Sequence, residues 1–276
     1  LLKLISSGAS MLMMESTAVS KIGKITHADL CLSNQKQKKG FKNLISFLKS
    51  YDKDTPICLQ ISHAGRKGSS QIPWIKSNFP LSKKYKSWTT VSASSIKKDK
   101  NWPVPKSLSK KEIKKIVNDF VKTSQLAIGS GFDGLEIHMA HGYLLHQFLS
   151  PISNKRTDEY GGNLEKRCKF ALEIARRVRK IWPKNKILGA RITGSDHLKK
   201  GINIKDSIYL AKKLKSIGFN YVCVSSGGIL TKTKLKFYKG FRLKFASQIK
   251  KNSKIVVKTS GHMEDLSFAE KAIKKK

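Results

Sequence analysis

The chain has 276 residues, of which 39% are hydrophobic and 27% charged, and its formal net charge is +38. This balance supports a sizeable core and excludes an intrinsically disordered chain. No run of 18 or more apolar residues occurs, so no transmembrane helix is predicted. The charge raises nucleic acid as a partner. However, only eight of the 56 basic residues are Arg and the excess is spread over the whole chain, so we interpret it as a solvated lysine coat.

The four cysteines are scattered, at Cys31, Cys58, Cys168 and Cys223. No two of them have the C-x-x-C spacing, so neither a metal site nor a redox pair is indicated. Cys58 and Cys223 lie inside apolar runs and are expected to be small core residues. This usage is typical of a reducing compartment, which predicts a cytoplasmic protein.

Both ends of the chain predict a fragment of a longer protein. The first residues, LLKLISSGASMLMMES, lack an initiator Met and the basic and apolar regions of a signal peptide. They resemble the end of a helix that leads into a strand. The last residues, AEKAIKKK, resemble the middle of a helix.

Strands and helices alternate along the chain. The predicted strands span residues 11–19, 56–63, 132–138, 186–192, 221–226 and 254–260. The predicted helices span residues 40–51, 109–131, 164–182, 205–217 and 241–251, with a last one from about residue 263. Ser109 and Glu112 have the spacing of a capping box at the second of these helices. Residues 64–108 form a long irregular excursion with four prolines.

The six strands are continuous apolar runs, which indicates burial on both faces. Their alternation with helices predicts a parallel α/β fold, and no G-x-G-x-x-G follows a predicted strand and opens a helix, so the usual dinucleotide fingerprint is missing. Polar residues at the strand ends suit a (β/α)8 TIM barrel, whose active sites lie at the C-terminal ends of its strands. Because such a barrel needs eight strands, we expect residues 1–276 to form a single incomplete barrel domain that lacks the first and last strands.

The stretch at residues 132–162 places two histidines and a tyrosine at the end of a buried strand. Its sequence, EIHMAHGYLLHQFLSPISNKRTDEYGGNLEKR when extended from residue 136 to 167, closely resembles the signature of the Old Yellow Enzyme family. The segments LQISHAGRK and ARITGSD resemble two further family segments in the right order. The likeness covers nearly the whole chain and is closest to the bacterial branch of NADPH dehydrogenases and 2,4-dienoyl-CoA reductases.

This resemblance implies a flavin-dependent ene-reductase. The family binds FMN non-covalently at the barrel mouth and reduces it with NADPH or NADH. Hydride then passes to the β carbon of an α,β-unsaturated carbonyl compound, and a proton reaches the α carbon. An iron–sulfur cluster and FAD are implied only if the protein continues with the C-terminal extension of the dienoyl-CoA reductases.

The resemblance assigns three residues to the substrate. His138 and His141 match the pair that hydrogen-bonds the substrate carbonyl, where two imidazole N–H donors stabilise developing negative charge. Tyr143 matches the proton donor. From the residues alone, His-x-x-His also fits a metal site or a satisfied core pair, and a metal needs at least a third ligand.

Four further residues are matched to FMN by the same resemblance. Gln60 corresponds to the residue at the flavin pyrimidine edge, and Arg191 to the cation near flavin N1. Ser16 falls where the family's strand end touches FMN, and Gly261 ends the strand whose backbone helps to hold the phosphate. On the residues alone, a half-buried polar residue satisfied by the backbone is a serious alternative for Gln60.

Alternatives remain at this stage. A dienoyl-CoA reductase would carry a cysteine cluster after the point where this sequence stops. A basic nucleic-acid-binding module would use the lysine coat, although we do not expect nucleic acid or a membrane as partner. The expected partner is a small unsaturated carbonyl compound, with a homo-oligomer left open.

Overall fold

A sheet of six parallel strands forms the centre of the protein in the order β1-β2-β5-β6-β7-β8. The computed structural model describes residues 1–231, 233 and 235–274. The strands are β1 (Leu12–Ala18), β2 (Ile57–Ser62), β5 (Gly134–Met139), β6 (Ile187–Thr193), β7 (Tyr221–Ser225) and β8 (Val256–Thr259). All six predicted strands are therefore confirmed. They follow the chain order because each returns through a helix to pair beside its predecessor.

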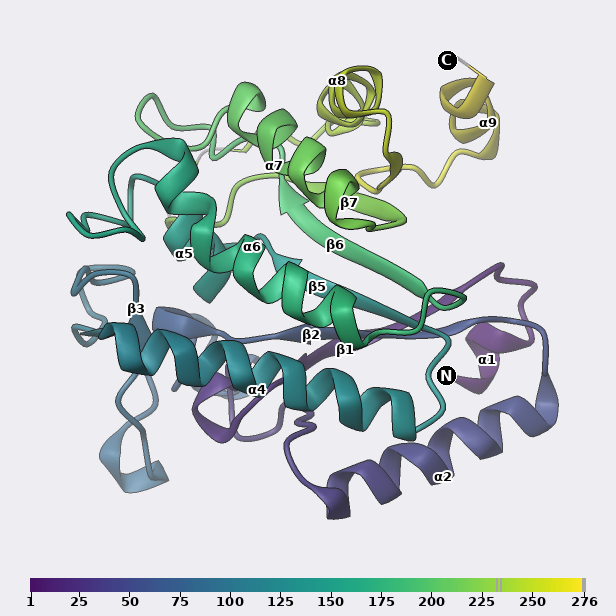
Figure 1. The fold of residues 1–276 in the computed structure, drawn as a ribbon, viewed down its shortest axis with the longest axis horizontal. Coiled ribbons are helices and arrows are strands. Elements are labelled where there is room, and N and C mark those ends of the chain that lie inside the picture. The colour runs from purple at the N-terminus through teal and green to yellow at the C-terminus, as the bar shows by residue number, and fades with distance from the viewer. Residues whose placement is uncertain (232, 234, 275–276) are drawn as a thin grey trace.

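The helices pack in chain order along one face of this sheet, except the last one, which has no buried residue and stands apart from the sheet (Figure 1). They are α1 (Leu2–Ile5), α2 (Gln35–Tyr51), α4 (Lys110–Gly129), α5 (Leu144–Leu149), α6 (Leu164–Ile181), α7 (Ile204–Ile217), α8 (Leu243–Ser253) and α9 (Leu266–Lys274). Helix α4 packs against α2 and α6, and α7 packs against α6 and α8. Helix α2 begins at Gln35, ahead of the predicted residue 40. The final two lysines of the predicted last helix lie outside the described residues.

The predicted capping box at the start of α4 is confirmed. The Ser109 hydroxyl accepts from the backbone N–H of Glu112, and the Glu112 carboxylate accepts from the N–H of Ser109 at 2.9 Å. Two of the orphan N–H groups at the helix start are thereby satisfied.

The central strands β2, β5 and β7 are buried on both faces, as predicted, and β6 is largely so. The prediction is wrong for the outer strand β8, which has no buried residue, and for part of β1. The two faces of the central strands differ in chemistry. On β5, Leu135 and Ile137 join the apolar core together with residues of the surrounding helices. Because successive side chains of a strand alternate, Glu136 and His138 point to the opposite face. Glu136 pairs in register with Gln60, and His138 with Arg191. Polar side chains therefore line the inner face, and those nearest the C-terminal strand ends are the predicted site residues.

The excursion at residues 64–108 is folded, with the short elements η2 (Gly65–Lys67), α3 (Pro73–Lys76), η3 (Lys83–Tyr85), β3 (Val91–Ser92) and β4 (Lys106–Ser107). Arg156 holds it to the barrel, because its guanidinium donates to the carbonyls of Ala93 at 3.0 Å and Leu108 at 2.6 Å. Asp158 in turn pairs with Arg156 at 2.6 Å. These side chains fix the long loop.

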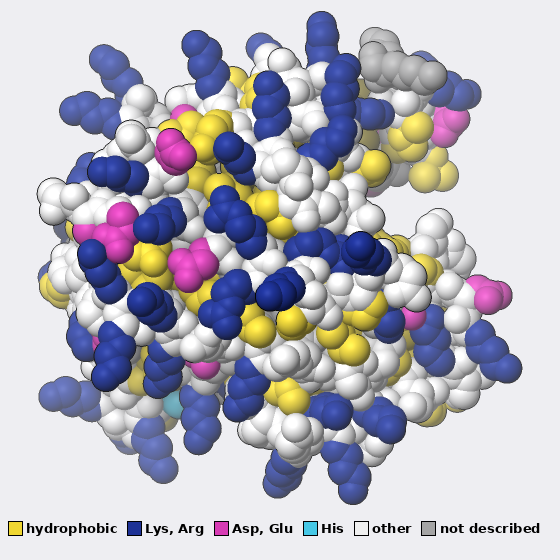
Figure 2. Space-filling model, viewed as in Figure 1, with side chains coloured by type: hydrophobic (Ala, Val, Ile, Leu, Met, Phe, Trp, Pro, Cys, Tyr) yellow, Lys and Arg dark blue, Asp and Glu magenta, His cyan; other side chains and the backbone are white. Residues whose placement is uncertain are grey.

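Basic side chains are scattered over the face of the molecule in Figure 2 and are not gathered into one patch. This distribution agrees with the interpretation as a lysine coat. Within the described residues, no helix has the length and apolar character needed to cross a membrane.

Candidate active site

The candidate site is built around a tight turn at the C-terminal end of β5. His141 and Gly142 both have left-handed backbone conformations, with φ of 55° and 70°. A Cβ at Gly142 would overlap the carbonyl oxygen of Gly228, and a Cβ at Gly228 would lie 2.8 Å from the Cα of His141. The glycine pair therefore lets the loop after β7 approach the turn closely, and the turn places Tyr143 beside the histidines.

The two histidines form a directed hydrogen-bond chain. The N–H of Ala140 donates to His138 Nδ1 at 3.1 Å, His138 Nε2 lies 3.1 Å from His141 Nδ1, and His141 Nε2 lies 2.6 Å from the hydroxyl of Ser225. Burial lowers the pKa of His141 to about 3, aided by the charge of Arg191. Burial also lowers the pKa of His138 well below its usual value. Both imidazoles are therefore neutral near pH 7, with one N–H each.

Tyr143 completes this group of three. Its ring centre lies 4.8 Å from that of His138 and 6.5 Å from that of His141, both edge-on. Burial raises the pKa of Tyr143 to about 12, so the phenol carries its proton. Tyr143 and His141 are only half-buried, and both are within reach of a ligand at the strand ends. The structure thus brings together the three residues predicted to face the substrate.

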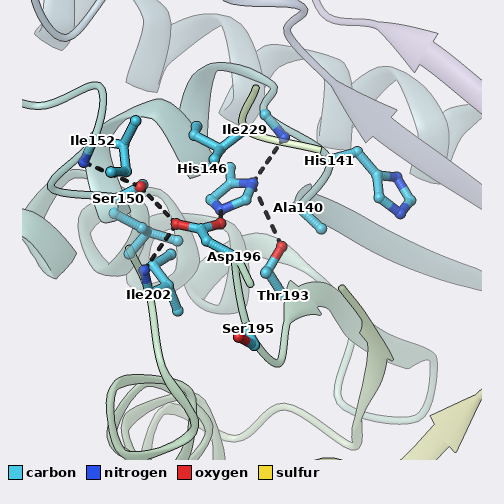
Figure 3. Close-up of polar contacts among 12 residues, drawn as sticks. Ala140, His141, His146, Ser150, Ile152, Thr193, Ser195, Asp196, Ile202 and Ile229 are labelled. Atoms are coloured by element: carbon cyan, nitrogen blue, oxygen red, sulfur yellow. Dashed lines mark hydrogen bonds and ion pairs between the residues drawn. The ribbon is translucent and has the colours of Figure 1, made fainter. Parts of the chain in front are cut away.

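A fully buried network beneath the turn holds it in place (Figure 3). The N–H of Gly142 donates to His146 Nδ1 at 2.7 Å, so the proton of the imidazole is on Nε2, which lies 2.8 Å from Asp196 Oδ1. The other carboxylate oxygen accepts from the Ser150 hydroxyl at 2.7 Å and the Ile202 N–H at 2.8 Å. The loop after β6 is thereby tied to the turn that carries His141.

Gln60 lies deeper on the inner face. Its amide nitrogen donates to Glu136 Oε1 at 2.6 Å, while the hydroxyl of Tyr221 donates to Glu136 Oε2 at 2.8 Å. Lys258 approaches the same carboxylate at 3.6 Å. Glu136 therefore fixes the direction of the Gln60 amide, and the assignment of Gln60 to a flavin stays a prediction.

Arg191 stands on β6, in register with His138 on one side and Cys223 on the other. Among the described residues, three buried polar atoms near these strand ends lack a hydrogen-bond partner: Arg191 Nε, Ser226 Oγ and Arg242 Nε. Burial and then the charge of Arg191 lower the pKa of Arg242. Within the described part of the chain, neither arginine has a carboxylate partner within salt-bridge distance. Two neighbouring cations without an anion favour an anionic ligand at this place.

Ser16 lies on the outer strand β1, and Gly261 lies just after the other outer strand, β8. The Ser16 hydroxyl, in β1, donates to that of Ser62 at 2.7 Å. Gly261 follows β8 with φ of 130°, and a Cβ there would lie 2.7 Å from the Phe241 ring. Their roles toward a cofactor stay predictions.

Three residues at the site were not singled out from the sequence: Lys67, Ser225 and Arg242. Lys67 Nζ donates to the His141 carbonyl at 2.6 Å, and burial, with the charges of Lys98 and Arg66, lowers the pKa of Lys67 to about 7. The rarity of arginine in this lysine-rich chain is the signal that could have pointed to Arg242. Ser225 carried no comparable signal.

Comparison with known proteins identifies the family. The family described as NADH:flavin oxidoreductase / NADH oxidase matches residues 5–276. An NADH:flavin oxidoreductase of Gibberella zeae is 36% identical over 287 aligned positions, covering 98% of this chain and 69% of that protein. An NADPH dehydrogenase of Bacillus subtilis is 33% identical over 263 positions, covering 95% of this chain and 72% of that protein. The chain thus spans roughly two thirds to three quarters of these relatives.

Solved structures show the same fold. A 2-naphthoyl-CoA reductase superposes with a TM-score of 0.88 at 21% identity, covering 100% of this chain and 42% of that one. Morphinone reductase superposes with a TM-score of 0.77 at 23% identity, covering 98% of this chain and 73% of that one. The six strands and their helices are accordingly those of a (β/α)8 barrel. The chain belongs to the NADH:flavin oxidoreductase / NADH oxidase family, the Old Yellow Enzyme family of FMN-binding, NAD(P)H-dependent oxidoreductases.

Proposed function

We propose that the protein is an ene-reductase, which uses NAD(P)H and FMN to reduce the activated C=C bond of an α,β-unsaturated carbonyl compound. The observation that carries the proposal is the assembly of His138, His141 and Tyr143 at the end of β5, beside Arg191 on β6. Two imidazoles and a phenol thus lie next to a cation on the neighbouring strand, which supports the binding of a carbonyl oxygen and the donation of a proton there.

The residues present fit FMN. Arg191 and Arg242 are cations without a carboxylate among the described residues, and Arg191 Nε, Arg242 Nε and Ser226 Oγ are buried without a partner there. A phosphate and the negative charge of a reduced flavin ring are the kinds of group that such donors stabilise. Gln60 offers an amide oxygen beyond its bond to Glu136. When bound, FMN supplies the hydride chemistry between NAD(P)H and the β carbon of the alkene.

The protein's own residues have two tasks in this proposal. His138 and His141 bind the carbonyl oxygen and stabilise the negative charge that grows on it as the β carbon is reduced. Tyr143 gives its proton to the α carbon. A phenol with a pKa of about 12 holds that proton until the neighbouring carbon becomes strongly basic.

The test separates the two half-reactions of the FMN-loaded protein by stopped-flow absorbance. Tyr143→Phe removes the proton and keeps the ring, so flavin bleaching by NADPH should be unchanged and re-oxidation by 2-cyclohexen-1-one should slow by roughly 10²-fold or more. Tyr209→Phe, on the outer helix α7, is the matched control and should leave both rates unchanged. Equal re-oxidation rates in Tyr143→Phe and the parent protein would show that another group donates the proton. Failure of the parent protein to reduce the enone would overturn the proposal as a whole.

The remaining expectations are part of the same proposal. The chain acts as one domain, because buried residues from five of the six strands, β8 being the exception, join those of most helices in one apolar cluster. All four cysteines are free and buried, which suits a reducing cytoplasm. The partner is a small unsaturated carbonyl compound.

A further inference from the structure

We propose that Ser225 is a positioning residue that switches the tautomer of His141, so that His138 and His141 both donate to one ligand oxygen. The inference rests on the proposed function, because it assumes that the ligand oxygen is the carbonyl of an enone. It adds a residue on β7 to a pair that lies on and after β5.

One end of the hydrogen-bond chain is fixed by the backbone. His138 Nδ1 accepts the N–H of Ala140 at 3.1 Å, and a neutral imidazole has only one proton. That proton is therefore on Nε2, which lies 3.1 Å from His141 Nδ1. A backbone N–H cannot reverse its direction, so His138 always presents a donor to His141.

The other end of the chain can reverse. The Ser225 hydroxyl lies 2.6 Å from His141 Nε2 and can either accept or donate a proton there. Ser225 is fully buried on β7, and its backbone carbonyl accepts the N–H of Gly194 at 2.7 Å, so the strand holds the hydroxyl in place. Only the hydroxyl proton has to turn.

Neither arrangement satisfies every donor when the ligand is absent. With the proton on His141 Nε2, Nδ1 accepts from His138, but the Ser225 proton has no acceptor among the described residues. With the proton on Nδ1, Ser225 donates to Nε2, but the N–H groups of His138 and His141 face each other across 3.1 Å. The first arrangement leaves one weak hydroxyl donor without an acceptor, whereas the second places two N–H donors against each other. The first arrangement is therefore favoured in the free protein.

A ligand oxygen reverses this preference. A carbonyl oxygen has two lone pairs and can accept from His138 Nε2 and His141 Nδ1 together. Ser225 then donates to His141 Nε2, and every proton of the chain has an acceptor. His141 loses a proton at Nε2 and gains one at Nδ1 by exchange with solvent, so the net charge does not change. Without Ser225 as donor, Nε2 would be left unpaired in the ligand-bound state.

Nitrogen-15 NMR of the histidine side chains tests the switch directly. The FMN-loaded, oxidised full chain is compared without and with saturating 2-cyclohexen-1-one, in the absence of nicotinamide so that no turnover occurs. We expect the His141 proton on Nε2 in the free protein and on Nδ1 with the enone, while His138 keeps its proton on Nε2. The same His141 tautomer in both states would overturn the inference.

Three variants add an independent measurement, the dissociation constant for the enone. Ser225→Ala should weaken enone binding about tenfold or more, because a buried imidazole nitrogen loses its partner, and should leave FMN affinity unchanged. Ser225→Thr keeps the hydroxyl on a strand that accepts β-branched residues and should restore binding. Ser207→Ala, the matched control, removes a buried hydroxyl that donates to the Thr193 carbonyl and should change neither constant. Equal enone affinity in Ser225→Ala and the parent protein would also contradict the switch.

The two proposals fail in different ways. If the parent protein neither binds nor reduces the enone, the proposed function is wrong and the switch falls with it. If it reduces the enone but the His141 tautomer stays fixed, the function stands and only the role of Ser225 is wrong. If Ser225→Ala does not fold, the tautomer measured in the parent protein decides by itself.

Discussion

The hydroxyl of Tyr221 donates to Glu136 across the inner face of the sheet, at 2.8 Å, and its ring fills the space above Gly189. Gly189 lies between them on β6, in register with both residues. Because residue 189 has no side chain, Tyr221 on β7 reaches across β6 to Glu136 on β5. Glu136 also accepts from Gln60, so this contact helps to fix the side chain that is predicted to bind the flavin.

Gly189→Ala should disturb this arrangement. The new Cβ would overlap the Tyr221 ring, and the ring must move to avoid it. We expect a loss of roughly 1–3 kcal/mol in the free energy of unfolding, measured by urea denaturation. Gly40→Ala on the exposed face of α2 is the control, because a Cβ there meets nothing within 4 Å. It should raise stability by about 0.5–1 kcal/mol. Equal effects at both positions would show that the space above Gly189 is not needed.

Asp196→Asn should weaken the network under the turn. The carboxylate accepts from His146 on one oxygen and from Ser150 and Ile202 on the other. An amide has one acceptor end, so at least one buried donor would face its NH2 group, at a cost of about 1–3 kcal/mol. Asp206→Asn at the exposed start of α7 is the control, since one oxygen is enough for its capping bond. A stability loss no larger for Asp196→Asn than for Asp206→Asn would refute the role given to the network.

The buried His63 and His138, together with the half-buried His141, should make the fold labile to acid. Burial lowers the pKa of His63 to about 4 and that of His141 to about 3, and the pKa of His138 also lies well below its usual value. The unfolded chain therefore binds more protons between about pH 6.5 and pH 3, so stability is complete above this range and falls as the pH drops through it.

The pH dependence of the free energy of unfolding tests this expectation. Each such histidine contributes up to about 1.4 kcal/mol per pH unit to the fall in the free energy of unfolding. His63→Asn keeps an acceptor for the N–H of Gly65, which His63 Nδ1 accepts at 3.0 Å, but cannot titrate. Urea denaturation at pH 7, 6 and 5 should therefore show a shallower pH dependence for this variant. An unchanged slope would mean that His63 does not contribute.

Arg242→Gln should lower FMN affinity. The guanidinium Nε is buried without a partner among the described residues, and the charge lies near that of Arg191. Losing a charged donor to an anionic group costs roughly 10- to 100-fold in affinity. Flavin fluorescence titration measures the change, with Arg176→Gln on the exposed face of α6 as the control. Equal FMN affinity in the two variants would place the anionic group elsewhere.

Much of the site was predictable from the sequence because local patterns determine it. The strand ending at His138, the turn to Tyr143 and the capping box at Ser109 depend on residues close together in the chain. The motif around His138 also identified the family, which the comparisons confirm. The pairing of Gln60 with Glu136 on the inner face was not predicted, because it depends on the register between β2 and β5, which the sequence pattern of each strand does not report.

The sequence by itself determined the parallel α/β barrel fold and its strands and helices. It also determined that the histidine pair and the tyrosine lie at the end of one strand. Only the tertiary structure decided which groups stand against them: Ser225 at His141, 84 residues away, Asp196 at His146, and Glu136 between Gln60 and Tyr221. The physical reason is that strand order and register bring distant residues to one end of the sheet, whereas periodicity reports only near neighbours. Proton positions in the histidine chain follow from those distant contacts, and with them the chemistry proposed for the site.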